Sequence, residues 1–235
     1  MPLPETINTL ILLMPSWVGD VVMASCVWNM TRKKYPNAKI VAAIRPHLAP
    51  LLEGVEAFDE VVPVDMKTSV FNSAKQCKAI QADAIILLPN SFRAALIARL
   101  AGIPIRAGYR RDRRSWLLTD VVEIKVQETP SSTIEYYGHL ANELFAMREE
   151  STLPSLPHHD SKLLLFEDAD TPIVLLVAGA SKAQKRWSPI NFAKVADALH
   201  EEGATCFAIG SPEEHSLVQE VINHASSPIK DLTQV

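Results

Sequence analysis

A segment near the start of the chain combines a glycine, a carboxylate and an indole in a way that could support acid–base chemistry. In chain order it consists of Pro15-Ser16-Trp17-Val18-Gly19-Asp20. Gly19 allows a ligand to approach the backbone, and a helix starting here presents free N–H groups to an anion or a sugar hydroxyl. Asp20 could then act as a general base. The alternative is that Asp20 only caps the helix, which is a common role of aspartate.

A second segment, residues 179–189, is rich in cations. It places Ser181 among three basic residues, Lys182, Lys185 and Arg186. Hydroxyl and cationic groups in one loop are typical of phosphate sites, although the spacing of a Walker A loop is missing. Ser188 is the expected N-cap of the following helix, with Pro189 at its first position. A solvated basic loop is the alternative.

Two further groups carry charge that could bind a ligand. Five arginines with interleaved aromatic residues could dock an anionic substrate or acidic lipid headgroups, or could form a solvated loop; they are Arg106, Arg110, Arg111, Arg113 and Arg114, with Tyr109 and Trp116. The stretch Gly210–His215 holds acids, and one of them could bind a ribose hydroxyl or simply stabilise a helix N-terminus. A GxGxxG fingerprint is absent, which argues against a dinucleotide dehydrogenase.

The elements that must position these segments alternate between short apolar runs and longer amphipathic ones. The predicted strands are Leu10–Met14, Lys39–Ile44, Glu60–Val64, Ala84–Leu88, Val121–Val126, Ile173–Val177 and Thr205–Ile209. The predicted helices are Val21–Tyr35, Pro46–Glu53, Asn72–Gln81, Ser91–Ala101, Ser132–Met147, Asn191–Glu202 and Glu213–His224. This alternation predicts an α/β fold with doubly wound parallel sheets, so the loops above lie at the carboxyl ends of strands, where such sheets bind ligands.

A linker-like stretch between Glu149 and Asp170 predicts two domains. Residues 1–155 form a complete Rossmann-like domain, and residues 156–235 form a partial one, because a mean sheet has roughly five or six strands. The net charge of -4 gives no support to a nucleic-acid partner, and three dispersed cysteines suit a reducing compartment without a metal site. With neither a signal peptide nor an apolar run long enough to span a bilayer, we expect a cytoplasmic protein, by default a monomer.

Taken together, four stretches resemble glycosyltransferase family 9, the lipopolysaccharide heptosyltransferases. They are Pro15–Ala24, Leu88–Leu96, Ala101–Pro104 continuing to Gly108–Arg110, and Lys185–Trp187. The tryptophan before Val-Gly-Asp favours the type II members of the family. The resemblance implies a GT-B arrangement with the acceptor on the N-terminal side and the donor mostly on the C-terminal side. It also implies transfer of heptose from ADP-L-glycero-D-manno-heptose to the lipopolysaccharide inner core, with inversion and without a metal or cofactor.

The resemblance also implies roles for individual residues. Asp20 would be the catalytic base, and Ser181, Lys185 and Glu214 would bind the donor, Glu214 through its ribose. The acceptor side would comprise Ser16, Trp17, Gly19, Asn90, Arg93 and Arg110. The implied partners are ADP-heptose and the anionic lipopolysaccharide core; peripheral contact with the cytoplasmic face of the inner membrane stays open.

The chain departs from the family pattern in two places. Ala178-Gly179 stands where the family usually has Pro-Gly, and Ala180 replaces a common hydroxyl residue. The chain also ends soon after Asp231-Leu232-Thr233, before the later donor motif of the family, so we expect a C-terminally truncated form with weak or no activity. The alternatives are a non-catalytic remnant that binds an acceptor or partner, and a nucleotide-sugar epimerase on the same scaffold.

Overall fold

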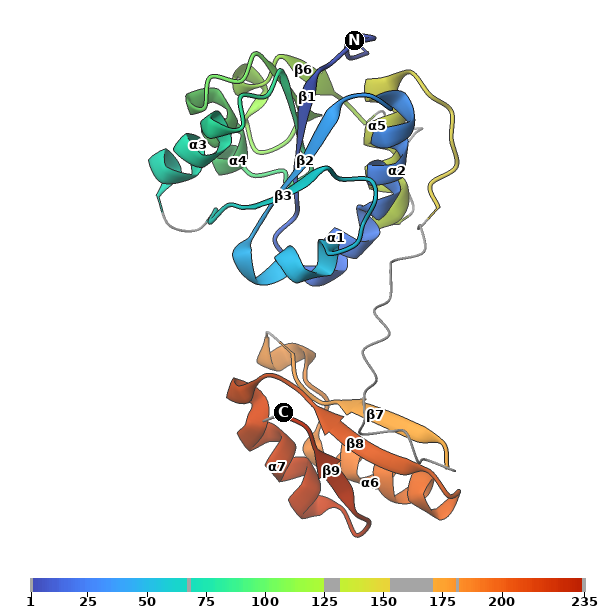
Figure 1. Ribbon diagram of the computed structural model, residues 1–235. Coiled ribbons are helices and arrows are strands. Elements are labelled where there is room, and N and C mark those ends of the chain that lie inside the picture. The colour runs from blue at the N-terminus through green and yellow to red at the C-terminus, as the bar shows by residue number, and fades with distance from the viewer. Residues whose placement is uncertain (1, 67–68, 125–131, 153–170, 181, 234–235) are drawn as a thin grey trace. The chain divides into compact units, whose positions relative to one another are not determined.

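The computed structural model describes residues 2–66, 69–124, 132–152, 171–180 and 182–233 (Figure 1). The chain divides into two units, residues 1–158 and 159–235, and each is described by itself. The boundary expected between residues 155 and 156 lies outside the described residues.

Unit 1 is built on a parallel sheet in which β1 and β4 form the centre. Its strands are β1 (Thr9–Leu13), β2 (Lys39–Ile44), β3 (Glu60–Pro63), β4 (Ala84–Leu87), β5 (Ile105–Tyr109) and β6 (Asp120–Val122). The strand order is β3-β2-β1-β4-β5-β6, and every pair is parallel. Strands β2 and β3 therefore lie on one side of β1, and β4, β5 and β6 lie on the other. Sheets of this kind bind ligands at the switch point, which here is between β1 and β4.

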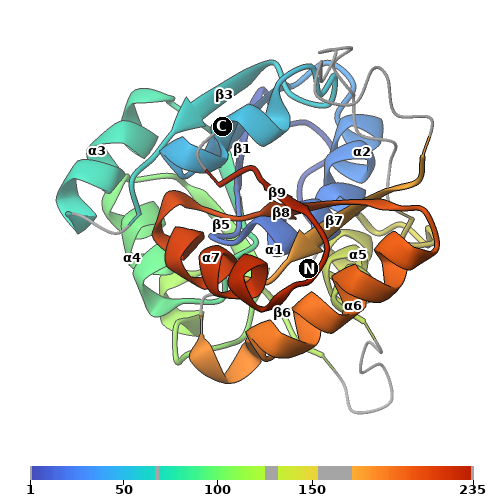
Figure 2. The same cartoon turned by 90° about the horizontal axis from the view of Figure 1, so that it is seen from below.

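In the described part of unit 1, five α-helices cover the two faces of this sheet. They are α1 (Val18–Met23), α2 (Ser25–Lys34), α3 (Val70–Ala79), α4 (Phe92–Leu100) and α5 (Thr133–Phe145), with 3-10 turns at Pro46–Leu52 and Ser115–Leu117. Both Figure 1 and Figure 2 show α3 and α4 side by side on one face, with α2 and α5 on the other.

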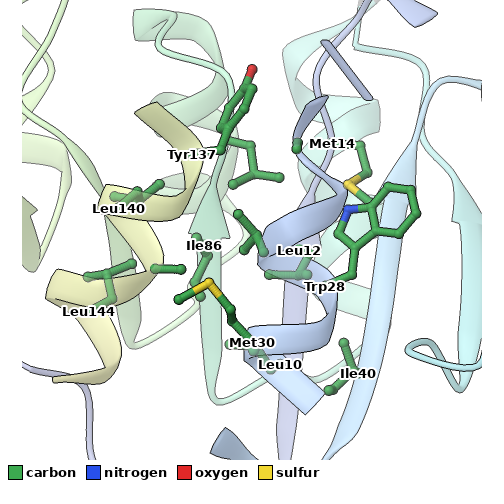
Figure 3. Close-up of a cluster of buried hydrophobic side chains, with 14 of the residues drawn as sticks. Leu10, Leu12, Met14, Trp28, Met30, Ile40, Ile86, Tyr137, Leu140 and Leu144 are labelled. Atoms are coloured by element: carbon green, nitrogen blue, oxygen red, sulfur yellow. The ribbon is translucent and has the colours of Figure 1, made fainter. Parts of the chain in front are cut away.

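The alternation of β1 side chains explains why both faces are filled. Leu10 and Leu12 point into a core with Trp28 of α2 and Leu140 of α5 (Figure 3), whereas Ile11 and the other odd-numbered positions point toward α3 and α4. Because Leu10–Leu13 are fully buried on both faces of the sheet, this part of β1 is apolar, as expected of a parallel strand between two helical layers.

Unit 2 has a smaller parallel sheet in the order β7-β8-β9. Its elements are β7 (Ile173–Val177), α6 (Pro189–Glu201), β8 (Thr205–Ile209), α7 (His215–His224) and β9 (Ile229–Asp231), with 3-10 turns at Ala183–Lys185 and Pro212–Glu214. Ala196 of α6 and Val218 of α7 share one core with Cys206 of β8, so α6 and α7 pack on the same face. The other face of β7 exposes Ile173, Leu175 and Val177 by 38%, 49% and 58%.

The structure differs from the sequence predictions of local structure at five places. Strands β5 and β9 were not predicted, and the single helix expected over Val21–Tyr35 is two helices that meet at Ala24. The strand expected over Val121–Val126 is the shorter β6, although residues 125–126 lie outside the described residues. The helix expected over Pro46–Glu53 is a 3-10 helix over Pro46–Leu52 with Pro50 inside it. In β5 an arginine and a glycine interrupt the apolar pattern, and pairing with β4 and β6 overrides it.

Candidate functional site

The loop after β1 lies at the switch point of the unit 1 sheet and carries Asp20 in the first turn of α1. The N-cap of α1 is Trp17, which has extended backbone and makes no side-chain cap bond. The alternative that Asp20 caps this helix is therefore wrong. The Asp20 carboxylate is half-buried, whereas Gly19 and the Trp17 indole are exposed, the latter by 64%. A carboxylate next to free helix N–H groups suits proton transfer at a bound hydroxyl.

Two neighbouring residues support this loop. Arg45, directly after β2, donates from Nη1 to the Ser16 carbonyl oxygen at 3.1 Å. Burial and, after it, the negative charge of Asp20 raise the pKa of Tyr137 on α5. The Tyr137 phenol thus stays protonated at neutral pH beside Asp20. Sequence reasoning missed Arg45, although its place at the end of a predicted strand was a usable signal.

Asn90, in the loop after β4, is held by hydrogen bonds on both sides of its amide. Its Nδ2 donates to the Tyr136 hydroxyl at 2.8 Å, and its Oδ1 accepts from Arg114 Nη2 at 3.3 Å. The rings of Tyr136 and Tyr109 lie 4.3 Å apart, and the Tyr109 hydroxyl donates to the Tyr136 carbonyl at 2.7 Å. These contacts fix the Asn90 side chain at the carboxyl ends of β4 and β5. Sequence reasoning missed this role of Tyr136, whose hydroxyl accepts from an amide distant in the chain.

Arg114 is the centre of this network and is fully buried. Its guanidinium donates to the carbonyl oxygens of Pro89, Ser91 and Tyr109, which joins the loops after β4 and β5. Burial lowers the pKa of Arg114 to about 10, so it remains charged at neutral pH. A Cβ at Gly108 would lie 3.1 Å from Arg114 Nη2 and 3.2 Å from the Leu87 oxygen, which explains the glycine there.

The five arginines predicted as one basic group therefore divide into different environments. Arg106 donates from Nε to the Leu117 oxygen and from Nη1 to the Ile103 oxygen, and burial lowers its pKa. Together with Arg114 it serves the backbone, whereas Arg111 and Arg113 are exposed. Arg110 is also exposed and forms an ion pair with Glu123. The prediction of a single ligand-facing cluster is wrong.

Arg93, expected on the acceptor side, lies in the first turn of α4 and is half-buried. Its Nε donates to the Met66 oxygen at 2.6 Å, which ties α4 to the segment that follows β3. Like Asn90, it follows the carboxyl end of β4. The structure thus brings Asp20, Asn90 and Arg93 to the same edge of the sheet.

In unit 2 the cationic loop follows β7, as predicted. Lys185 ends a short 3-10 turn and is exposed, and Arg186 Nε donates to the Ala180 oxygen at 3.0 Å. Ser188 and Pro189 occupy the N-cap and first position of α6, which confirms the prediction for the start of this helix. Ser181 lies outside the described residues.

Glu214 connects the loops after β7 and β8. Its Oε2 accepts from the Ser211 N–H at 2.9 Å and the Ser211 hydroxyl at 3.2 Å, so this oxygen stabilises the 3-10 turn before α7. The ribose contact expected of Glu214 stays a prediction. A methyl group on Gly179 would lie 2.0 Å from Glu214 Oε1. The carboxylate therefore occupies the space that the missing side chain of Gly179 leaves, at the carboxyl ends of two parallel strands.

Both units are thus Rossmann-like α/β structures with polar loops at the carboxyl edge of a parallel sheet. The chain belongs to glycosyltransferase family 9 (heptosyltransferase), whose family model matches residues 70–233. Among the described residues, no helix has the length and apolar character needed to cross a membrane.

Individual proteins support this assignment. Lipopolysaccharide heptosyltransferase 2 of Escherichia coli K12 is 28% identical over 227 residues, covering 88% of this chain and 65% of the relative. The structure of E. coli ADP-heptose LPS heptosyltransferase II matches with a TM-score of 0.81 and 25% identity, over 97% of this chain and 73% of that one. A family 9 glycosyltransferase from Veillonella parvula, 20% identical, matches with the same TM-score, 97% and 70% of the two chains being covered. The predicted α/β fold of GT-B type is confirmed, in a chain that spans 65% of the length of the first of these relatives.

Proposed function

We propose that this chain acts in heptose transfer from ADP-L-glycero-D-manno-heptose to the lipopolysaccharide inner core. The observation that carries the proposal is Asp20 at the switch point of the unit 1 sheet, with a cationic loop and Glu214 at the carboxyl edge of the unit 2 sheet, in a family 9 chain. The names of its relatives, a lipopolysaccharide heptosyltransferase 2 and an ADP-heptose transferase structure, supply the donor and the acceptor.

The reaction is a single displacement at the anomeric carbon. Asp20 removes the proton of the acceptor hydroxyl as its oxygen attacks, and the bond between the anomeric carbon and the ADP oxygen breaks on the opposite face, so the configuration inverts. Negative charge then develops on the departing diphosphate. Lys185, with Ser181 as its predicted partner, stabilises that charge, and Glu214 Oε1 accepts from the ribose.

On the acceptor side the structure offers groups that suit an anionic sugar. The exposed indole of Trp17 can pack against a sugar ring, and Ser16 and Gly19 offer loop backbone beside Asp20. Asn90, Arg93 and Arg110 supply amide and guanidinium donors after β4 and β5. We place this reaction at the cytoplasmic side of the inner membrane, with the chain as a monomer.

A transfer assay tests the proposal. The chain is incubated with ADP-heptose and a lipopolysaccharide core acceptor that lacks the transferred heptose, and mass spectrometry measures the acceptor. We expect the acceptor to gain one heptose with release of ADP. In Asp20→Asn the rate of this transfer should fall by about a hundredfold or more. No product from a folded chain that binds ADP-heptose would instead favour a non-catalytic binding role. Chemical conversion of ADP-heptose in a parallel reaction without acceptor would indicate an epimerase.

The expectation of weak or no activity stays a prediction with its own control. The E. coli relative, assayed in parallel, sets the reference rate. We expect much slower turnover from the 235-residue chain. Equal turnover by the two proteins would contradict that expectation while supporting the proposed reaction.

A further inference from the structure

Arg45 brings a positive charge to the loop that carries Asp20. It directly follows β2, which pairs in parallel with β1 so that Ala43 lies opposite Leu13. The carboxyl ends of the two strands therefore meet at one edge of the sheet. At that edge Arg45 Nη1 donates to the Ser16 carbonyl oxygen at 3.1 Å, so the guanidinium lies against the loop between β1 and Asp20.

Most of the hydrogen-bonding capacity of Arg45 is left for a ligand. A guanidinium has five N–H donors and no acceptor. In the part of the chain that the structure describes, the bond to Ser16 is the only hydrogen bond of the Arg45 side chain, and no ion pair includes it. The side chain is half-buried. A positive charge that is partly removed from water and has no carboxylate partner favours an anion.

Two other arginines at this edge of the sheet have less capacity for a ligand. Arg110 forms an ion pair with Glu123, so its charge is already opposed within the chain. Arg114 is fully buried and donates to backbone carbonyl oxygens. Arg45 differs from Arg110 in charge balance and from Arg114 in access to solvent.

We propose that Arg45 binds an anionic oxygen group of the acceptor, a phosphate or a carboxylate, and thereby holds the attacking hydroxyl at Asp20. A planar guanidinium suits such groups because it can donate two parallel N–H bonds to them. The contact with Ser16 places the bound anion next to the loop whose Asp20 takes the hydroxyl proton. This inference rests on the proposed function and adds a specificity-determining residue to its acceptor side.

Acceptor binding in the absence of donor tests this role. Lipid-free core oligosaccharide that lacks the transferred heptose is titrated into the folded chain by calorimetry. Three forms are compared: untreated, dephosphorylated, and dephosphorylated with the carboxyl groups amidated. We expect Arg45→Met to weaken binding of the untreated form by about tenfold or more. Arg45→Lys should weaken it less, because lysine keeps the charge but loses the planar fork. The uncharged form should bind to Arg45→Met as well as it binds to the wild type.

The dephosphorylated form distinguishes the two anions. If the difference between wild type and Arg45→Met disappears with this form, the bound group is a phosphate; if the difference persists, the bound group is a carboxylate. Arg99→Met is the matched control, since it removes an exposed arginine from the last turn of α4. This variant should bind all three forms as the wild type does.

Two readouts separate a binding role from a structural one. The midpoint of thermal unfolding and the affinity for ADP should be nearly unchanged in Arg45→Met. Equal binding of the untreated form by wild type and Arg45→Met, an equal loss with the uncharged form, or no acceptor binding by the folded wild type would overturn the inference. Because no donor is present, a chain that binds the acceptor through Arg45 but transfers no heptose would contradict the proposed function alone.

Discussion

At the scale of single residues, arginine has different environments and roles at two adjacent positions. Arg113 is exposed and Arg114 is fully buried, with its guanidinium bound to backbone carbonyls of two loops. Nothing in the spacing of the arginines distinguishes them, since the difference comes from the left-handed turn that precedes Arg114. Arg114 supports Asn90 of the proposed acceptor side without facing the ligand itself.

The adjacent pair provides a matched stability test. Arg114→Met should lower the free energy of unfolding by about 3 kcal/mol, because several buried carbonyl oxygens lose their donors. Arg113→Met should change it by less than about 0.5 kcal/mol, as expected of an exposed side chain. Urea unfolding followed by circular dichroism measures both. Similar losses in the two variants would contradict the role assigned to Arg114.

The lowered pKa of Asp231, at the end of β9, leads to a prediction of how the stability of unit 2 depends on pH. Burial alone would raise its pKa, but hydrogen bonds from Thr233 and Gln219 and the nearby His215 lower it below 3.8. A carboxyl group whose pKa is lower in the folded state than in the unfolded state stabilises the fold at pH values above its unfolded-state pKa. That stabilisation is lost as the pH falls through its folded-state pKa. Asp231→Asn should therefore be less stable than the wild type at pH 7, with a difference that shrinks below about pH 4.

Thermal unfolding at several pH values measures this difference. The exposed Glu220 on α7 supplies the control, since Glu220→Gln should show a small difference that changes little over the same range. A difference for Asp231→Asn that grows as pH falls would contradict the assignment.

At the scale of elements, contacts between loops at the carboxyl edges of the sheets are the feature that the sequence predicts least well. Gly179 and Glu214 belong to loops after different strands, and their contact follows from the parallel register of β7 and β8. The sequence located both residues but predicted no link between them. It missed β5 because pairing with β4 and β6, rather than an apolar pattern, makes Ile105–Tyr109 a strand. β9 is a three-residue strand, too short to show a pattern.

The Gly179 contact predicts a specific loss of nucleotide binding. In Gly179→Ala the new methyl group would lie 2.0 Å from Glu214 Oε1, so the carboxylate must move away from its place at the edge of the sheet. Because the proposed function assigns Glu214 to the donor ribose, we expect ADP affinity to fall by about tenfold or more. Titration calorimetry with ADP measures the loss.

Gly203→Ala serves as the control in the same unit. Gly203 has φ of +88° with nothing within 4 Å of a built Cβ, so the substitution should cost about 1 kcal/mol of stability and leave ADP affinity unchanged. If both glycine variants weakened ADP binding equally, the effect would reflect general destabilisation rather than displacement of Glu214.

At the scale of the whole molecule, the sequence was most informative where periodicity is strong. Alternating apolar strands and amphipathic helices predicted two parallel α/β units, because burial of both faces of Leu10–Leu13 and Ala84–Leu87 leaves an unmistakable apolar run. The loops that carry the proposed chemistry were located for the same reason, since each follows a predicted strand. The networks around Asn90 and Glu214 could not be predicted, because they join segments distant in sequence.

The buried cysteines give a prediction for the whole chain. Burial raises the pKa of Cys26 and of Cys77 to about 11, and Cys206 is buried as well. Thiolate is the reactive form, so all three should react with a disulfide reagent only after unfolding. Colorimetric thiol titration with and without guanidinium measures this, and rapid reaction of any thiol in the folded chain would contradict the buried positions.

We propose that the carboxyl edge of the unit 2 sheet binds the ADP part of a heptose donor. Calorimetric titration of the folded chain with ADP and with ADP-heptose tests it most directly. We expect saturable micromolar binding that is lost in Lys185→Ala and retained in Asp20→Asn, since the proposed role of Asp20 is on the acceptor. Absence of binding by a chain shown to be folded, or equal binding by Lys185→Ala, would contradict it.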